Sequence, residues 1–314
     1  MRQLILLIAA AIALSGCGTD QASPTAATPT TTTLPPVDAS FWSTVPQTDE
    51  QRAEVSARAR LIDVCALVPR SELAALGEVK TVENDQTDSC RVELTSPGAT
   101  EDKVSWSSLV VFGDIPQPGA TVKQLGEVTL SILPSALDLS NEKTCNATAK
   151  FRSGAAIYFQ TTTPTTTDGC ARLESLVDGA VRRWLTSPPQ GTSPDTKRTA
   201  LHGADPCAVR AHLDGTGPFG VPTLNSCGFT YRGEDVVVSY EIRGRGLLSR
   251  NEQTVDGRVV HILDASATVV VGPELGPATS SLLGSPVPVV NVAAESEDVA
   301  KDVLRQIFTM FPAS

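Results

Sequence analysis

The sequence has few of the residues that most often carry catalytic or metal chemistry. It contains three histidines in 314 residues, and aromatic residues make up 4% of the chain. His202, His212 and His261 form no His-x-x-x-His or His-Glu-x-x-His pair, the spacings by which one helix places two imidazoles on a zinc ion. We therefore expect no metal site, no cofactor and no catalytic residues.

Positive charge is also in short supply. The chain has 25 Lys and Arg residues against 35 Asp and Glu residues, a formal net charge of −10. Proteins that bind nucleic acids place an excess of positive charge against the phosphates, so this balance argues against a nucleic-acid partner. The hydrophobic fraction of 41% is enough for folded cores, and the length predicts two modest domains.

Long apolar runs are missing, apart from one at the N-terminus. The run from Leu4 to Leu14 follows Arg2 and ends in small residues, and it is shorter than the roughly 20 residues that a membrane-spanning helix needs. We expect residues 1–16 to be an export signal. The end of the run, Leu14-Ser15-Gly16-Cys17, resembles the lipobox of bacterial lipoproteins.

That resemblance implies a role for Cys17. In lipoproteins the lipobox cysteine takes a diacylglyceryl group on its sulfur, for which a thiolate is a suitable nucleophile, and becomes the new N-terminus. We therefore expect the chain to be anchored by lipid to the outer, extracytoplasmic face of the cell membrane. The alternative is an ordinary signal peptide with a cysteine there by chance.

Residues 17–47 are rich in Thr, Pro, Ala and Ser. Such a composition buries too little apolar surface to offset the entropy of ordering the chain. We expect a tether between the anchor and the folded part, which begins near residue 48. Thr48 and Gln51 have the spacing of a capping box and predict a helix from Asp49 to about Arg60.

The sequence of the folded part indicates an internal duplication. We expect domain 1 at 48–187, a Pro- and Ser-containing linker at 188–199 and domain 2 at 200–314. Each domain opens with an Asp-x-Cys turn, at Cys65 and at Cys207, before a short helix. Each has a second cysteine at the start of a strand-like run, and each closes with an amphipathic helix pattern, at 173–185 and at 300–311.

Between these helices lie β-branched segments separated by Gly, Pro and Asp. The segments 103–112 and 127–133 in domain 1, and 235–242, 259–263 and 268–271 in domain 2, predict antiparallel strands. The expected fold class is α+β: two similar small domains, each an antiparallel sheet packed by an N-terminal short helix and a C-terminal amphipathic helix.

With Cys17 assigned to lipid, an even set of six cysteines remains, and none of them forms a Cys-x-x-Cys pair. In an exported chain an even set indicates disulfides, although six cysteines allow 15 connectivities. The repeat favours one of them. The simplest pairing joins Cys65 to Cys90 and Cys207 to Cys227, with a bond from Cys145 to Cys170 as a further clamp on domain 1.

A family resemblance rests on the lipobox, the Thr/Pro tether and the opening Asp-x-Cys-Ala-Leu-Val-Pro-x-Ser-Glu-Leu-Ala-Ala-Leu-Gly at 63–77. Together they resemble actinobacterial lipoproteins that carry a domain of unknown function, here in tandem copies. Asp205-Pro206-Cys207 matches the Asp-Pro-Cys-type opening of such domains more literally than residues 63–65 do. The chain is also faintly similar to the extracellular sensor domains of mycobacterial receptor kinases. Neither resemblance brings catalytic residues with it.

Two motifs suggest chemistry by their letters alone. Gly215 to Gly220 satisfies Gly-x-Gly-x-x-Gly, but a dinucleotide site needs this motif between a strand and a helix, and here we predict a loop. Ser140 to Lys143 has the Ser-x-x-Lys spacing of penicillin-recognising enzymes, without their Ser-Asp-Asn and Lys-Thr-Gly elements. We expect a polar turn there.

The leading functional hypothesis is a non-enzymatic, lipid-anchored surface protein that binds an envelope protein, a cell-wall polymer or a small apolar ligand. The first alternative is an envelope carrier or sensor of lipids or small molecules, with a cavity between a sheet and its closing helix. The second alternative is a hydrolase of the envelope that has no recognisable motif.

Overall fold

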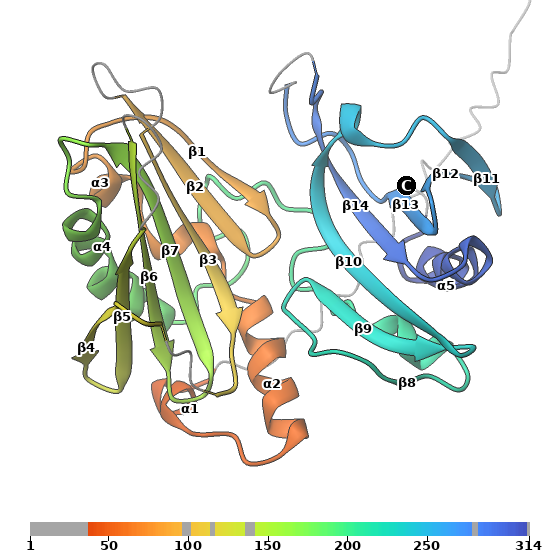
Figure 1. The fold of residues 1–314 in the computed structure, drawn as a ribbon, viewed down its shortest axis with the longest axis horizontal. Helices are drawn as coiled ribbons and strands as arrows, with labels where there is room; N and C mark the ends of the chain where they lie inside the picture. The colour runs from red at the N-terminus through yellow and green to blue at the C-terminus, as the bar shows by residue number, and fades with distance from the viewer. Residues whose placement is uncertain (1–36, 96–101, 114–116, 136–141, 278–281, 313–314) are drawn as a thin grey trace, which may run out of the picture.

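The computed structural model describes residues 37–95, 102–113, 117–135, 142–277 and 282–312. Two seven-stranded sheets lie side by side, the first in residues 78–164 and the second in residues 217–293 (Figure 1). All neighbouring strands in both sheets run antiparallel. The predicted class, α+β with antiparallel sheets, is confirmed. The prediction that the tether extends to residue 47 is wrong for its last part, because residues 39–43 form a helix and Trp42 is fully buried in the core. We call residues 37–187 the first half and residues 200–312 the second half.

The helices precede and follow the sheet of the first half. They are α1 (Ala39–Ser43), α2 (Asp49–Arg60), the 3₁₀ helix η1 (Val64–Leu67), α3 (Arg70–Leu73) and α4 (Gly169–Trp184). The helix predicted at Asp49–Arg60 is confirmed at both ends. Thr48 and Gln51 form the expected capping box, in which the Thr48 side chain accepts from the Gln51 N–H and the Gln51 side chain accepts from the Thr48 N–H.

The first sheet has the spatial order β1-β2-β3-β7-β6-β5-β4. Its strands are β1 (Glu78–Gln86), β2 (Ser89–Thr95), β3 (Lys103–Val110), β4 (Thr121–Leu125), β5 (Val128–Pro134), β6 (Glu142–Phe151) and β7 (Ala155–Pro164). The predicted strands at 103–112 and 127–133 correspond to β3 and β5. The strands β1, β4, β6 and β7 were not predicted, because charged residues or runs of Thr and Ala hide their alternation.

The second sheet has the order β11-β12-β13-β14-β10-β9-β8. Its strands are β8 (Gly217–Pro218), β9 (Ser226–Tyr231), β10 (Glu234–Gly244), β11 (Glu252–Val255), β12 (Arg258–Leu263), β13 (Ser266–Val270) and β14 (Pro286–Ala293). The half also contains the short 3₁₀ helices η2 (Ala208–His212) and η3 (Arg245–Leu247), and it ends with α5 (Glu297–Met310).

The two strand orders are the same order. When the second sheet is followed from its other edge, it runs β8-β9-β10-β14-β13-β12-β11, and subtracting seven from each number gives the order of the first sheet. In both, three strands from one edge meet the seventh strand in the middle, and the remaining strands return to the other edge.

One face of each sheet is apolar. In the first half, α4 packs on β5, β6 and β7, and α2 packs on β3 and β7. In the second half, α5 packs on β13 and β14. The amphipathic stripes of α4 and α5 are buried as the sequence pattern predicts, with Leu173, Val177 and Trp184 in one and Ala300, Leu304 and Ile307 in the other.

The segment 188–199 joins the halves, and it is held against the first half. The Asp63 backbone N–H donates to the Pro188 carbonyl at 2.8 Å, and the Gln190 side chain donates to the carbonyls of Arg60 and Ile62. The Arg70 guanidinium pairs with the carboxylate of Asp195 at 2.6 Å. These contacts fix the position of a segment whose composition alone indicates only a connector.

The tip of the β1–β2 hairpin touches the second half (Figure 1). Gln86 hydrogen-bonds to the backbone of Ile242 in β10, and Leu224, just before β9, belongs to the buried core cluster of the first half. The halves are therefore packed on each other as well as joined by the chain.

Candidate functional site

The expected lipid site, Cys17, lies outside the described residues. The other six cysteines form three disulfides, Cys65–Cys90, Cys145–Cys170 and Cys207–Cys227, with Cα–Cα distances of 5.2, 5.3 and 5.1 Å. These are the pairs favoured by the repeat. No bond crosses from one half to the other.

Two of the bonds occupy matching positions. Cys65 lies in η1 and is joined to the second strand of the first sheet, and Cys207 directly precedes η2 and is joined to the second strand of the second sheet. The third bond ties α4 to β6, which is one strand further along the sheet than β7, the strand that directly precedes the helix. It has no counterpart in the second half.

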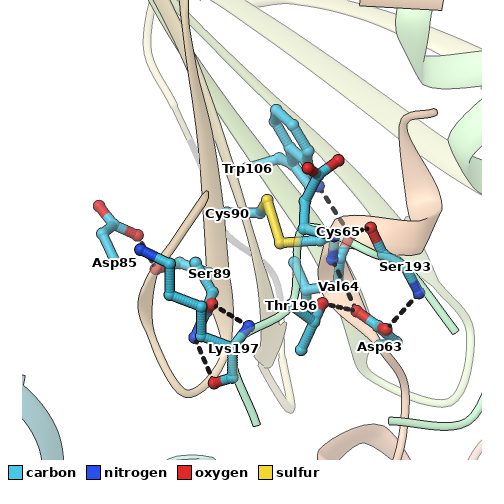
Figure 2. Close-up of a disulfide and its surroundings, with 12 residues drawn as sticks. Asp63, Val64, Cys65, Asp85, Ser89, Cys90, Trp106, Ser193, Thr196 and Lys197 are labelled. Carbon is cyan, nitrogen blue, oxygen red and sulfur yellow. Dashed lines mark hydrogen bonds between the residues drawn. A yellow bond between two sulfur atoms is a disulfide. The ribbon is translucent and has the colours of Figure 1, made fainter. Parts of the chain in front are cut away.

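Figure 2 shows that the Asp63 side chain is the centre of the turn beside the Cys65–Cys90 bond. Asp63 is fully buried. Its carboxylate accepts from the N–H groups of Cys65, Gly191 and Ser193 and from the Thr196 hydroxyl, at 2.6 to 3.1 Å. Four donors compensate its burial, and three of them lie in the segment 188–199. The carboxylate therefore serves to hold that segment.

The matching aspartate of the second half has a related role. The Asp205 carboxylate accepts from the Cys207 N–H at 3.0 Å and pairs with the Arg60 guanidinium at 3.4 Å. The Asp205 carbonyl accepts from the Tyr240 hydroxyl at 3.2 Å. Burial raises the pKa of Tyr240 and lowers that of Arg60. Both Asp-x-Cys turns thus hold the junction between the halves.

Of the three histidines, His202 is the one that lies at this junction, where it is buried. Its Nε2 lies 3.2 Å from the amide nitrogen of Asn84, and its Nδ1 lies 3.0 Å from the Thr199 hydroxyl. Burial lowers the pKa of His202 to about 4. The Asn84 amide oxygen accepts from the Lys197 N–H at 2.8 Å, which turns the amide nitrogen toward the ring. The Thr199 N–H also donates to Nδ1 at 3.1 Å, so a protonated ring would turn N–H groups toward both this backbone donor and the Asn84 amide nitrogen.

Asp88 lies at the tip of the β1–β2 hairpin, beside a junction cavity of about 10 Å³. Burial raises its pKa to about 6, and the neighbouring Asp85 acts in the same direction. The Asn225 amide approaches its carboxylate at 3.4 Å. The cavity is about large enough for one water molecule, so the junction has no room there for a larger ligand.

A larger cavity, of about 610 Å³, lies in the second half, where β12 and β13 separate. These strands pair at three positions, from Leu263↔Ser266 to His261↔Thr268. Beyond the last pair, Arg258 and Val259 of β12 and residues 269–271 line an open groove. Glu252, His261, Arg245, Pro273 and Pro312 complete its lining. The Arg258 guanidinium crosses the opening and donates to the Phe311 carbonyl at 2.5 Å and to the Val270 carbonyl at 3.3 Å.

In the described part of the chain, the glycine motif does not lie between a strand and a helix, as a dinucleotide site requires. In the Gly215–Gly220 segment, Gly217 and Pro218 form the edge strand β8 and no helix follows directly. Lys143 lies in the strand β6, and Ser140 is outside the described residues. Within the described ranges, no group of three or more His, Cys, Asp or Glu residues is placed to hold a metal ion, and no helix is long and apolar enough to cross a membrane.

Sequence reasoning missed the groove and the buried His202–Asn84 contact. The groove comes from strands that stop pairing, which no residue pattern marks, and the contact joins residues 118 positions apart. Comparison with known proteins adds no further assignment, because no family model, no curated protein and no solved structure matches the chain.

Proposed function

We propose that this chain is a non-enzymatic binding protein, anchored by lipid on Cys17 to the outer face of the cell membrane and built from two copies of one α+β unit. The observation that carries the duplication is the identical strand order of the two sheets, with a disulfide from the opening turn to the second strand in each. An oxidising location outside the cytoplasm accounts for three disulfides.

The polar groups at the junction support binding rather than catalysis. Asp63, Asp205 and His202 each make hydrogen bonds or an ion pair that hold the junction. A catalytic group must reach a substrate. The groove in the second half is lined by valines, Arg245, Arg258, His261 and Glu252. Its two arginines against one carboxylate suit a ligand with apolar and anionic parts.

Each copy is an antiparallel sheet whose apolar face is closed by a short opening helix and a long amphipathic helix. The contacts of η1 with α4, and of η2 with α5, support the same arrangement in both halves.

The anchor is tested by replacing Cys17 with alanine in the full chain. The variant is expected in the culture medium, and mass spectrometry of the wild-type protein is expected to show a diacylglyceryl group on residue 17. Retention of the Cys17→Ala variant in the membrane fraction would remove the anchor from the proposal.

A second candidate function is an envelope carrier of lipids, which the groove of about 610 Å³ favours by its size. The space between the second sheet and α5 is filled, since Val303, Leu304 and Ile307 are fully buried against it. A carrier would therefore have to use the groove at the margin of the sheet. Lipid extraction of the purified protein distinguishes the two, because a carrier is expected to copurify with a stoichiometric lipid.

A further inference from the structure

The groove in the second half has a closed counterpart in the first half. When seven is subtracted from the strand numbers of the second sheet, β12 corresponds to β5 and β13 to β6. Val128 opens β5 after a two-residue hairpin turn, and Arg258 opens β12 in the same way, since the last pairs of the two hairpins are Leu125↔Val128 and Val255↔Arg258. Arg258 thus occupies the position of Val128.

The two positions differ in their partners. Val128 is buried and paired with Phe151 at the end of β6. The register of β12 and β13, extended from His261↔Thr268, would place Val271 opposite Arg258, but the strands have separated by then. Val271 therefore corresponds to Phe151, and β5 and β6 remain paired over the length that is open in the second half.

In the first half, Trp42 of α1 packs beside Phe151, at the end of the β5–β6 pair. Its ring lies 6.4 Å from the ring of Phe151 and 5.2 Å from that of Trp184 in the last turn of α4, and Trp42 is fully buried. The Trp42 carbonyl accepts from the Ser153 N–H, two residues beyond Phe151. In the second half the matching elements, Val271, Pro273 and Pro312 after α5, line the groove.

Among the described residues of the second half, no helix precedes the Asp-x-Cys turn as α1 does in the first half. All three tryptophans of the sequence lie in the first half, and residues 200–204, which lead into the second Asp-x-Cys turn, form turns and no helix. At the matching place in the second half, the Arg258 side chain reaches the end of α5 beside the groove.

The charged residues of its lining indicate which kind of segment the groove binds. Arg245 and Arg258 line the groove, with Glu252 as its carboxylate. The Phe308 ring lies under the Arg258 guanidinium at 4.6 Å and holds it at the opening. A guanidinium binds a carboxylate through paired hydrogen bonds and stacks on an aromatic ring. The α1 segment combines a carboxylate and an aromatic ring. Asp38 is its N-cap, and the Trp42 ring packs beside Phe151.

We propose that the groove between β12 and β13 binds a short peptide segment of a partner protein that carries an aromatic side chain and a nearby carboxylate, in the place that Trp42 occupies in the first half. The valines of the groove contact the aromatic ring, and Arg258 binds the carboxylate. This inference rests on the proposed binding function and names the class of its ligand.

The test uses the full disulfide-bonded chain without its signal and with Cys17→Ser. The probe is a labelled peptide with the sequence of residues 37–45, Val-Asp-Ala-Ser-Phe-Trp-Ser-Thr-Val, and binding is followed by fluorescence anisotropy. Saturable binding to one site is expected. A peptide with alanine in place of tryptophan is expected to bind at least about tenfold more weakly, which corresponds to about 1.4 kcal/mol.

Three variants locate the site. Val271→Phe introduces the residue of the first half and is expected to abolish binding, as is Val259→Trp, which narrows the groove from an exposed position and carries little risk for folding. Arg258→Val, again the residue of the first half, is expected to weaken binding of the aspartate-containing peptide more than binding of a peptide with asparagine there. Val122→Ala, on the exposed strand β4, is the matched control and should bind as the wild type does.

Several results would overturn the proposal. They are the absence of saturable binding, equal binding of the tryptophan-free peptide, and unchanged binding to the folded Val271→Phe and Val259→Trp variants. A peptide that bound by displacing Trp42 from the first half would bind the Val271→Phe and Val259→Trp variants as well as the wild type. Failure of peptide binding leaves the lipid anchor untouched, and failure of the Cys17→Ala test leaves the groove untouched, so the two proposals fail separately.

Discussion

The side-chain amide of Gln86 pairs with both backbone groups of Ile242, 156 positions away. Its oxygen accepts from the Ile242 N–H at 3.0 Å, and its nitrogen donates to the Ile242 carbonyl at 3.2 Å. Ile242 lies beyond the part of β10 that pairs with β9, where the last pair is Ser239↔Ser226. Gln86 thus satisfies backbone groups at this position, as a neighbouring strand does elsewhere.

We expect Gln86→Ala to destabilise the contact between the halves. The substitution removes two hydrogen bonds and leaves two backbone groups without these partners, at a cost of about 1 to 3 kcal/mol. Urea unfolding measures the change. Gln124→Ala, at an exposed position of β4, is the matched control. An unchanged unfolding curve for Gln86→Ala would contradict the structural role of the pair.

Asp88→Asn is expected to stabilise the protein above pH 6. Burial raises the pKa of Asp88 from 3.8 to about 6, so the folded state binds the proton more tightly than the unfolded state does. The associated stability is present below about pH 4 and is lost as the pH rises to 6. The asparagine avoids this loss, and we expect a gain of roughly 1 to 3 kcal/mol at pH 8.

The measurement is urea unfolding of the wild type and Asp88→Asn at pH 3.5 and at pH 8. The difference between the two proteins should be larger at pH 8. Asp235→Asn, at an exposed position of β10, is the control and should show no such dependence. A difference for Asp88→Asn that is the same at both pH values would show that its carboxylate keeps its ordinary affinity for protons.

His202 is expected to remain neutral at pH 5. Burial lowers its pKa from 6.5 to about 4, so the folded state binds the proton less tightly than the unfolded state, and stability falls as the pH decreases from 6.5 through 4. NMR titration of the imidazole measures the pKa directly. The variant His202→Gln should lose this part of the acid sensitivity. A midpoint near 6.5 for His202 would show that the ring is exposed to water.

Replacement of Cys145 and Cys170 together by alanine should cost about 3 to 4 kcal/mol in the chain-entropy account of a loop of this length. The bond ties α4 to β6, so hydrogen exchange is expected to rise in α4 before it rises in α5. Equal protection of α4 in the variant and the wild type would show that packing alone holds the helix.

Local patterns predicted the elements that depend on neighbours in the sequence. The capping box at Thr48, the stripes of α4 and α5 and the strands β3, β5, β10, β12 and β13 lie where their residues indicate. The missed strands are of another kind. In β6 and β7, small residues and threonines occupy inward positions, and β14 contains two prolines. Their strand conformation depends on pairing with distant partners.

The candidate site was predicted less well than the fold. The cysteine pairs followed from the repeat, because both halves place a cysteine before a short helix and another at the second strand. The groove did not follow from any pattern. Val128 and Arg258 occupy equivalent positions in the two halves. The groove beside Arg258 becomes evident only from the loss of pairing between β12 and β13, whereas β5 and β6 stay paired at Val128.

The sequence by itself predicted the long helices and the division into two similar halves, because these depend on composition and on periodicity over a few residues. The export signal and the tether before residue 37 stay predictions. Tertiary structure alone decided that Asp63 holds the segment between the halves, that Trp42 closes the first half and that the matching place in the second half is open. These features arise from contacts between residues far apart in the chain, and such contacts depend on how the sheets and helices pack.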